Sequence, residues 1–132
     1  MKTLNLTLKK KWFDMIKSGE KKEEYREIKK FWATRLLTKI LVPWGGYLSP
    51  LADLVNGDLE MNGFKEFAGN PFATFDTVTF RNGYSANAPT ITVECLGISI
   101  GTAKPEWSDN WQGQVFVIKL GNIINPQTKT IK

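Results

Sequence analysis

The stretch Gly19–Arg26 reads GEKKEEYR and places six charged side chains directly after a glycine that can end a helix. Its fixed positions form the motif G-x-K-x-x-E-x-R, spelled by Gly19, Lys21, Glu24 and Arg26. Because Glu24 and Arg26 are two residues apart, they share one face if the chain is a strand here. The motif predicts a charged turn and a short strand that presents a carboxylate beside a guanidinium. A Glu24–Arg26 salt bridge that only fixes the turn is the alternative interpretation.

The residues before the motif predict a strand and then a short helix. Leu4–Leu8 alternates apolar and polar residues with period two, as a half-buried strand does. From Trp12 to Ile16 the apolar residues follow a helical period, and Ser18-Gly19 can end that helix. Glu23–Glu27 then reads as a short strand. Strand, helix, charged turn and strand therefore follow one another.

A second helix is predicted from Lys29 to Ile40. Its apolar face is formed by Ala33, Leu36, Leu37 and Ile40. Trp32 and Arg35 have two interpretations. Beside Lys and Arg, an exposed Trp32 offers a stacking platform for single-stranded nucleic acid. In the interpretation that we favour, Trp32 and Phe31 are core aromatics that close the end of a barrel.

The remainder divides into an insertion and a β-rich half. Residues 41–75 are interrupted by Gly, Pro and Asn but are rich in aromatics, so we expect this insertion to fold back as a lid or as a partner-binding surface. Thr77–Phe80 alternates as a strand, and a turn is predicted at Arg81–Tyr84. The strand that begins near Thr90 changes its apolar phase at Cys95-Leu96, which predicts a β-bulge. The apolar run Val115–Leu120 predicts a strand that is covered on both faces.

Composition excludes several classes of chemistry. The 132 residues suit a single domain over 1–132, and they include no histidine and one cysteine, Cys95. Histidine general bases, Ser-His triads and multi-cysteine zinc sites are therefore excluded, and we expect no metal site. No Walker loop or dinucleotide fingerprint is present, so no cofactor is expected. No apolar run is long enough for a membrane span or a signal peptide, so we expect a cytoplasmic protein with no membrane partner.

Charge is concentrated in the first third of the chain. Residues 1–40 hold 12 Lys and Arg against 5 Asp and Glu, whereas the rest hold 6 against 8. Such a field attracts polyanions and favours salt-sensitive phosphate contacts. The runs Lys9–Lys11 and Lys29-Lys30 fit phosphate contact or a merely solvated face equally well.

The chain resembles the ASCH domains of the PUA-like superfamily over about two thirds of its length. Thr7 and Lys9, the Trp12–Ile16 helix and the G-x-K-x-x-E-x-R motif look like the opening of that family. Members from gut bacteria and their phages are similar in three later segments, Asp76–Tyr84, Pro105–Trp107 and Val115–Gly121. The resemblance implies an α/β (α+β) fold, namely a small PUA-like mixed β-barrel of five or six strands with flanking helices, and the 41–75 insertion lies outside it.

The resemblance implies that the domain binds RNA or a nucleotide. Lys9, Lys21 and Arg26 would engage phosphate or carbonyl oxygens, and Glu24 would accept a hydrogen bond from a base amino group. Thr7, Trp32 and Arg35 are the further candidate ligand-binding residues. Whether Arg81, Tyr84 and Glu94 reach the cleft stays open, and the favoured interpretation of Glu94 is that it faces solvent on the side opposite the core.

Two other classes stay open. Some relatives are small amidohydrolases acting on acetylated cytidine, and ribonuclease activity is attributed to another. In an enzyme of this kind, Glu24 would be the general base, and Lys21, its pKa depressed by Arg26 and Lys22, would donate the proton or stabilise the oxyanion. Those amidohydrolases carry Thr where this chain has Glu24. The third class is a phage accessory factor that binds a protein partner through the 41–75 insertion.

Overall fold

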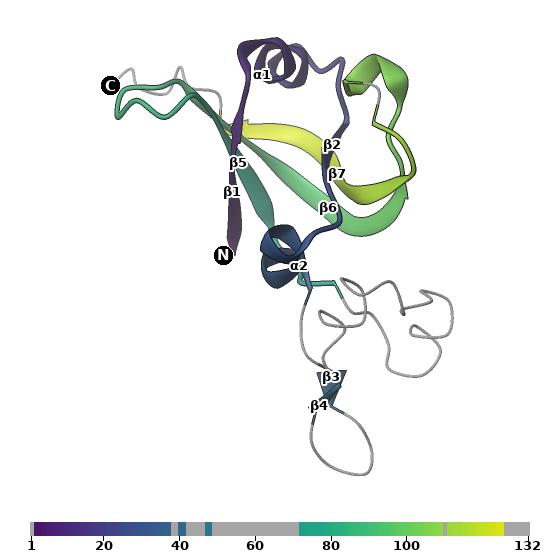
Figure 1. Ribbon diagram of the computed structural model, residues 1–132. Coiled ribbons are helices and arrows are strands. Elements are labelled where there is room, and N and C mark those ends of the chain that lie inside the picture. Colours follow the sequence, from purple (N-terminus) through teal and green to yellow (C-terminus); the bar gives the residue numbers. More distant parts are fainter. Residues whose placement is uncertain (1, 38–39, 42–46, 49–71, 110, 126–132) are drawn as a thin grey trace.

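Figure 1 shows a curved sheet accompanied by few helices. The computed structural model describes residues 2–37, 40–41, 47–48, 72–109 and 111–125. In chain order the elements are β1 (Thr3–Leu8), α1 (Lys10–Lys17), β2 (Glu23–Arg26), α2 (Lys30–Leu36), β3 (Ile40–Leu41), β4 (Tyr47–Leu48), β5 (Thr77–Asn82), β6 (Thr90–Thr102), the 3-10 helix η1 (Pro105–Trp107) and β7 (Gln114–Asn125).

Five of these strands form one mixed sheet in the order β1-β5-β6-β7-β2. β1 pairs parallel with β5, and the other neighbours are antiparallel. The sheet curls into a half-barrel whose two edges are β1 and β2, while β3 and β4 form a separate two-stranded ribbon. This is a small barrel-like α+β fold. The number of strands described in the sheet, five, agrees with the predicted five or six.

The N-terminal elements form where the sequence predicts them. The leucines of β1 stand at alternate positions and are all buried. The apolar face of α1 is buried through Trp12, Phe13 and Ile16. Gly19 follows α1 with a φ of +87°, a left-handed conformation that glycine adopts without strain. β2 then covers Glu23–Arg26, one residue shorter than predicted.

The predicted bulge in the long strand is confirmed. The register between β6 and β7 shifts repeatedly between Thr92 and Gly97, and Gly97 has a φ of +147°. The phase change places Val93 in the core and leaves Leu96 exposed. Cys95 is half-buried, and burial raises the pKa of its thiol, which disfavours the reactive thiolate.

β7 is covered on both faces, as its continuous apolar run predicts. Phe116, Ile118 and Leu120 belong to the main core cluster, which also contains the leucines of β1 and the apolar face of α1. Val115 and Val117 point into a smaller cluster on the other face, with Tyr25 and Ala103. Trp107 and Trp111 pack against this smaller cluster, so the C-terminal strand links the two cores.

The second helix is shorter than predicted. α2 ends at Leu36, and Leu37 is extended, with φ −114° and ψ 156°. The prediction of helix as far as Ile40 is therefore wrong, because Leu37 instead forms a β-bridge with Phe72. The interpretation of Phe31 as a core aromatic is also wrong, since Phe31 is 54% exposed.

The insertion leaves and rejoins the fold at adjacent points. Besides the Leu37–Phe72 bridge, the Ala73 amide donates to the Leu36 carbonyl over 2.9 Å. Because its two ends lie next to each other, the insertion lowers the stability of the surrounding fold by only a small loop-closure entropy. Its predicted role as a lid or a partner surface falls mainly on residues outside those described.

The predicted turn at Arg81–Tyr84 begins later, since β5 continues through Asn82 and the chain turns at Gly83, with φ +104°. None of the helices in the described ranges has the length and apolar character that crossing a membrane requires.

Candidate functional site

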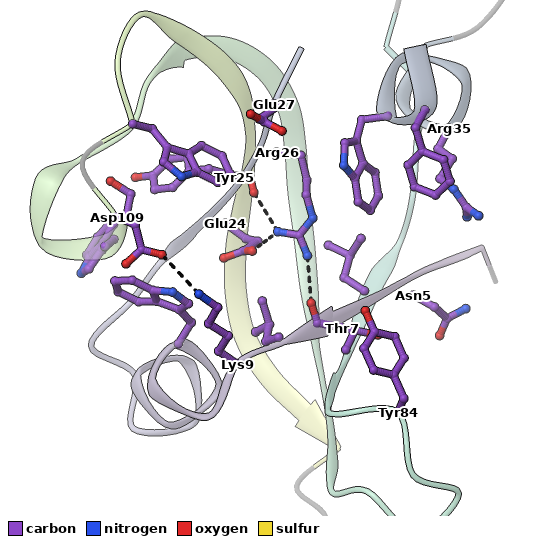
Figure 2. Close-up of a pocket in the computed structure, with 18 residues that line it drawn as sticks. Asn5, Thr7, Lys9, Glu24, Tyr25, Arg26, Glu27, Arg35, Tyr84 and Asp109 are labelled. Atoms are coloured by element: carbon purple, nitrogen blue, oxygen red, sulfur yellow. Dashed lines mark hydrogen bonds and ion pairs between the residues drawn. The ribbon is translucent and has the colours of Figure 1, made fainter. Parts of the chain in front are cut away.

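A pocket of about 720 Å³ lies between the two edge strands of the half-barrel, and we call it the seam pocket (Figure 2). Its wall includes the consecutive residues Asn5–Lys9, which end one residue after β1, and Glu24–Glu27, which end one residue after β2. Successive side chains of a strand point to opposite faces, so an unbroken run lines a pocket partly through its backbone edge. A ligand in the seam pocket therefore meets main-chain as well as side-chain polar groups.

Arg26 spans the seam from β2 to β1. Its Nη2 donates to the carbonyl oxygen of Thr7, 19 residues away, over 3.1 Å. Its Nη1 donates to Glu24 Oε2 and, over 2.7 Å, to the Tyr25 carbonyl. The guanidinium carbon also lies 4.9 Å from the ring centroid of Trp32. Figure 2 shows the Arg26 guanidinium between Glu24 and Thr7.

Glu24 is a buried carboxylate held between two cations. Its side chain is 6% exposed, with Oε1 at 3.1 Å from Lys21 Nζ and Oε2 on Arg26. The three charged residues of the motif therefore lie in contact, and the predicted pairing of the Glu24 carboxylate with the Arg26 guanidinium is present. A carboxylate offers about four lone-pair sites, so Glu24 retains acceptor capacity toward the seam pocket that it lines.

Lys21 is placed differently from the prediction of a ligand contact. It is 1% exposed and does not line the seam pocket. Its Nζ donates to the carbonyl oxygens of Glu23 (2.6 Å) and Trp107 (2.8 Å), besides facing Glu24. An ammonium has three N–H donors, so these partners occupy all of them. Lys21 positions Glu24 and joins β2 to η1.

The pKa of Lys21 is lowered from its ordinary value. Burial is the largest cause, and the nearby Arg26 adds a smaller effect, while Glu24 opposes both. The direction agrees with the prediction, but the prediction named Arg26 and Lys22 as the causes. Burial lowers the pKa because it removes water from the Lys21 ammonium, which is held by Glu24 and by the carbonyl oxygens of Glu23 and Trp107.

Tyr25 anchors the smaller core cluster. Its hydroxyl donates to Glu23 Oε1 over 2.6 Å and accepts from the Lys104 amide at 3.2 Å. Burial, followed by the hydrogen bond to Glu23, raises the pKa of Tyr25 well above its ordinary value of 10.0. At pH values just above 10, the Tyr25 hydroxyl therefore keeps its proton in the folded protein but loses it in the unfolded chain.

This pKa shift predicts an alkaline loss of stability. A raised folded pKa contributes stability that is fully present below pH 10, the unfolded value, and that declines as the pH rises from there toward the folded pKa. The stability of the wild type relative to Tyr25→Phe should therefore fall as the pH rises from about 10 to about 11.5. Urea denaturation across this range measures the difference. Tyr84→Phe, at an exposed ring, is the control, and parallel pH profiles for the wild type and Tyr25→Phe would contradict the assignment.

Aromatic rings line much of the seam pocket. The aromatic residues on its wall are Trp12, Tyr25, Phe31, Trp32, Tyr84, Trp107 and Trp111. Tyr25, Trp107 and Trp111 belong to one packed cluster, and the rings of Phe31 and Trp32 meet edge to face. No ligand role was predicted from the sequence for Trp107, Trp111 or Asp109. Two tryptophans among polar residues just after a long strand are the signal that could have identified them, because exposed-loop tryptophans often serve binding.

The other candidate residues lie at the pocket with different roles. Thr7 contributes its backbone carbonyl, and exposed Lys9 has its Nζ at 4.0 Å from Asp109 Oδ2 (Figure 2). Exposed Arg35 lines the pocket with its guanidinium carbon 4.8 Å from the Phe31 ring centroid. Trp32 is partly buried against the main core and also lines the seam pocket, so it has features of both a core aromatic and a stacking platform.

The structure shows which of the remaining three residues, Arg81, Tyr84 and Glu94, line the seam pocket. Tyr84 lines the seam pocket, whereas Arg81 does not. Glu94 lies elsewhere, as predicted, and its Oε1 accepts from the Asn122 amide over 2.9 Å. Within the described ranges, no three acidic or cysteine side chains are grouped as a metal ion would require.

Comparison with known proteins assigns no family to the chain. No family model and no solved structure matches it. A stretch of 61 residues, 46% of the chain, is 33% identical to mitogen-activated protein kinase kinase kinase 3 of Arabidopsis thaliana, and the match spans 9% of that protein. A likeness over so small a part of a long protein carries no assignment of activity. The chain also lacks histidine and hence the His-Arg-Asp loop of protein kinases.

Proposed function

We propose that this chain is an ASCH-type, PUA-like domain that holds a short single-stranded RNA or a nucleoside in the seam pocket. The observation that carries the proposal is the Glu24–Arg26 pair on the pocket wall, with aromatic rings on both sides of it. Aromatic rings stack on bases, and a fixed carboxylate and guanidinium distinguish the polar edges of what is stacked. A pocket that combines the two suits a heterocycle with amino and carbonyl groups.

The proposed roles follow from the contacts. Glu24 accepts from an amino group of the base, because its carboxylate is held in place by Lys21 and Arg26. Lys9 and Arg35 are exposed cations on the pocket wall and engage phosphate oxygens. Lys21 acts from behind the wall as a positioning residue. The positive N-terminal third raises the local concentration of such a polyanion.

Fluorescence anisotropy of a short single-stranded RNA tests the proposal. We expect binding that persists at near-physiological salt, because base stacking and buried hydrogen bonds depend little on salt. Duplex RNA of the same length is the control, since its bases cannot enter the pocket. Binding that disappears between low and physiological salt, or that is equal for the duplex, would mean that the lysines act only as diffuse charge.

A hydrolase is the second candidate, favoured by the buried carboxylate of Glu24 at the pocket wall. Removing a general base costs on the order of 10²- to 10⁴-fold in rate. An enzyme would therefore hydrolyse an acylated nucleoside or RNA, and Glu24→Gln would abolish most of that turnover. The binding proposal expects no turnover in the wild type. Release of acetate from acetylated cytidine and the appearance of RNA fragments are the two readouts.

The contacts favour binding over turnover. Each oxygen of Glu24 already faces a cation, and Lys21, the predicted proton donor, does not line the seam pocket. A rate that is unchanged in Glu24→Gln would exclude the catalytic role of this residue whatever the activity of the wild type.

A further inference from the structure

The aromatic rings of the seam pocket form two compartments. In the first, Lys21 Nζ lies 5.2 Å from the Trp12 ring centroid and 4.8 Å from that of Tyr25, and Trp107 and Trp111 pack on the cluster that contains Tyr25. In the second, the rings of Phe31 and Trp32 meet edge to face, with centroids 4.8 Å apart.

Arg26 stands between the compartments. Its guanidinium is fixed by Glu24 and by the Thr7 carbonyl, and it faces the Trp32 ring at 4.9 Å. In Figure 2, Asp109 lies on one side of Arg26, while Arg35 and Tyr84 lie on the other. A planar ligand group in one compartment is therefore separated from a group in the other by the width of a guanidinium.

The two compartments differ in exposure and charge. The first is formed by buried and partly buried rings and contains the carboxylates of Glu24 and Asp109. In the second, Phe31 is 54% exposed and Tyr84 is 90% exposed, and the Arg35 guanidinium covers the Phe31 ring at 4.8 Å. Exposed aromatic rings beside an arginine are the arrangement that stacks bases next to backbone phosphate.

We infer that the seam pocket takes two consecutive nucleotides of a single strand, an inference that rests on the proposed function. The first base enters the compartment of Trp12, Tyr25, Trp107 and Trp111 and is read by Glu24. The linking phosphate lies near Arg26 and Arg35. The second base stacks on Phe31 and Tyr84, on the side of the pocket that Asn5 and Arg35 also line. Glu24 is the carboxylate held in place by two cations, so the sharpest discrimination between bases is expected at the first position.

Calorimetric titration with nucleotides of increasing length tests the inference. The four nucleoside 5′-monophosphates, the four homodinucleotides with a 5′-phosphate and a six-nucleotide RNA are the probes. We expect the preferred dinucleotide to bind at least about tenfold more tightly than its mononucleotide, as one more stacked base provides. The six-nucleotide RNA should gain little beyond that.

Two variants locate the second base. Phe31→Ala and Tyr84→Ala should each lower dinucleotide affinity about tenfold and change mononucleotide affinity by less than about twofold. Leu96→Ala, at a residue that is 65% exposed and outside the pocket, is the matched apolar control. Both substituted rings are at the surface, so the variants should fold.

The outcomes separate this inference from the proposed function. Equal affinity for mononucleotide and dinucleotide, or equal weakening of both by Phe31→Ala and Tyr84→Ala, would overturn the two-nucleotide site and leave the proposed function standing. Absence of binding to every nucleotide and to the RNA would overturn both.

Discussion

Lys21→Met is expected to lower the free energy of unfolding by about 3–5 kcal/mol, the cost of removing one partner from a buried ion pair. The ammonium satisfies Glu24 and the carbonyl oxygens of Glu23 and Trp107 at 1% exposure. Methionine fills similar space but donates nothing, so these acceptors are left without that partner in a site that water does not reach freely. Urea denaturation at neutral pH measures the loss.

The neighbouring lysine provides the control for that experiment. Lys22 is exposed, and Lys22→Met should change stability by less than about 0.5 kcal/mol. The double variant Lys21→Met/Glu24→Gln should be more stable than the sum of its single variants predicts, because the residues contact each other. A Lys21→Met protein as stable as the wild type would contradict the role of Lys21 as the residue that holds the site together.

Arg26→Ala is expected to weaken RNA binding by at least about 30-fold, the equivalent of ~2 kcal/mol for a charge-assisted contact. The guanidinium lines the seam pocket, faces the Trp32 ring and holds Glu24 in place. Its loss removes a ligand contact and frees the carboxylate that reads the base. Fluorescence anisotropy at near-physiological salt gives the affinity.

A second substitution separates binding from folding, because Arg26 also joins β2 to β1. Arg26→Lys keeps the charge but lacks the planar guanidinium fork that reaches both Glu24 and the Thr7 carbonyl, so we expect an intermediate loss of about five- to tenfold. Lys22→Ala removes an equal charge outside the pocket and should change affinity by less than about twofold. Wild-type affinity in folded Arg26→Ala and Arg26→Lys would show that the seam pocket is not the binding site.

Periodicity predicted the parts of this fold that depend on neighbouring residues. The strand at Glu23–Arg26, the bulge near Cys95 and the doubly covered β7 all follow from local apolar patterns. The C-terminal end of α2 did not follow, because the Leu37–Phe72 bridge competes with helix and joins residues on opposite sides of the insertion. A local pattern contains no information about such a partner.

The same distinction applies to the candidate site. The motif predicted that Glu24 and Arg26 meet, since they share a strand face. It did not predict that Lys21, in a highly charged turn, is buried, because one of its acceptors, the Trp107 carbonyl, is 86 residues away. Trp107 itself reaches the seam pocket only because the sheet brings η1 beside β2. Contacts of this range depend on the completed half-barrel.

Amide chemical-shift mapping shows directly whether RNA binds in the seam pocket. A ¹⁵N-labelled protein is titrated with the preferred short RNA at near-physiological salt. We expect the largest changes at Asn5–Lys9 and Glu24–Glu27, with further changes at η1 and at Tyr84. Changes confined to the exposed lysines of α1, or centred on Asn122–Ile124 at the far end of β7, would contradict a ligand site in the seam pocket.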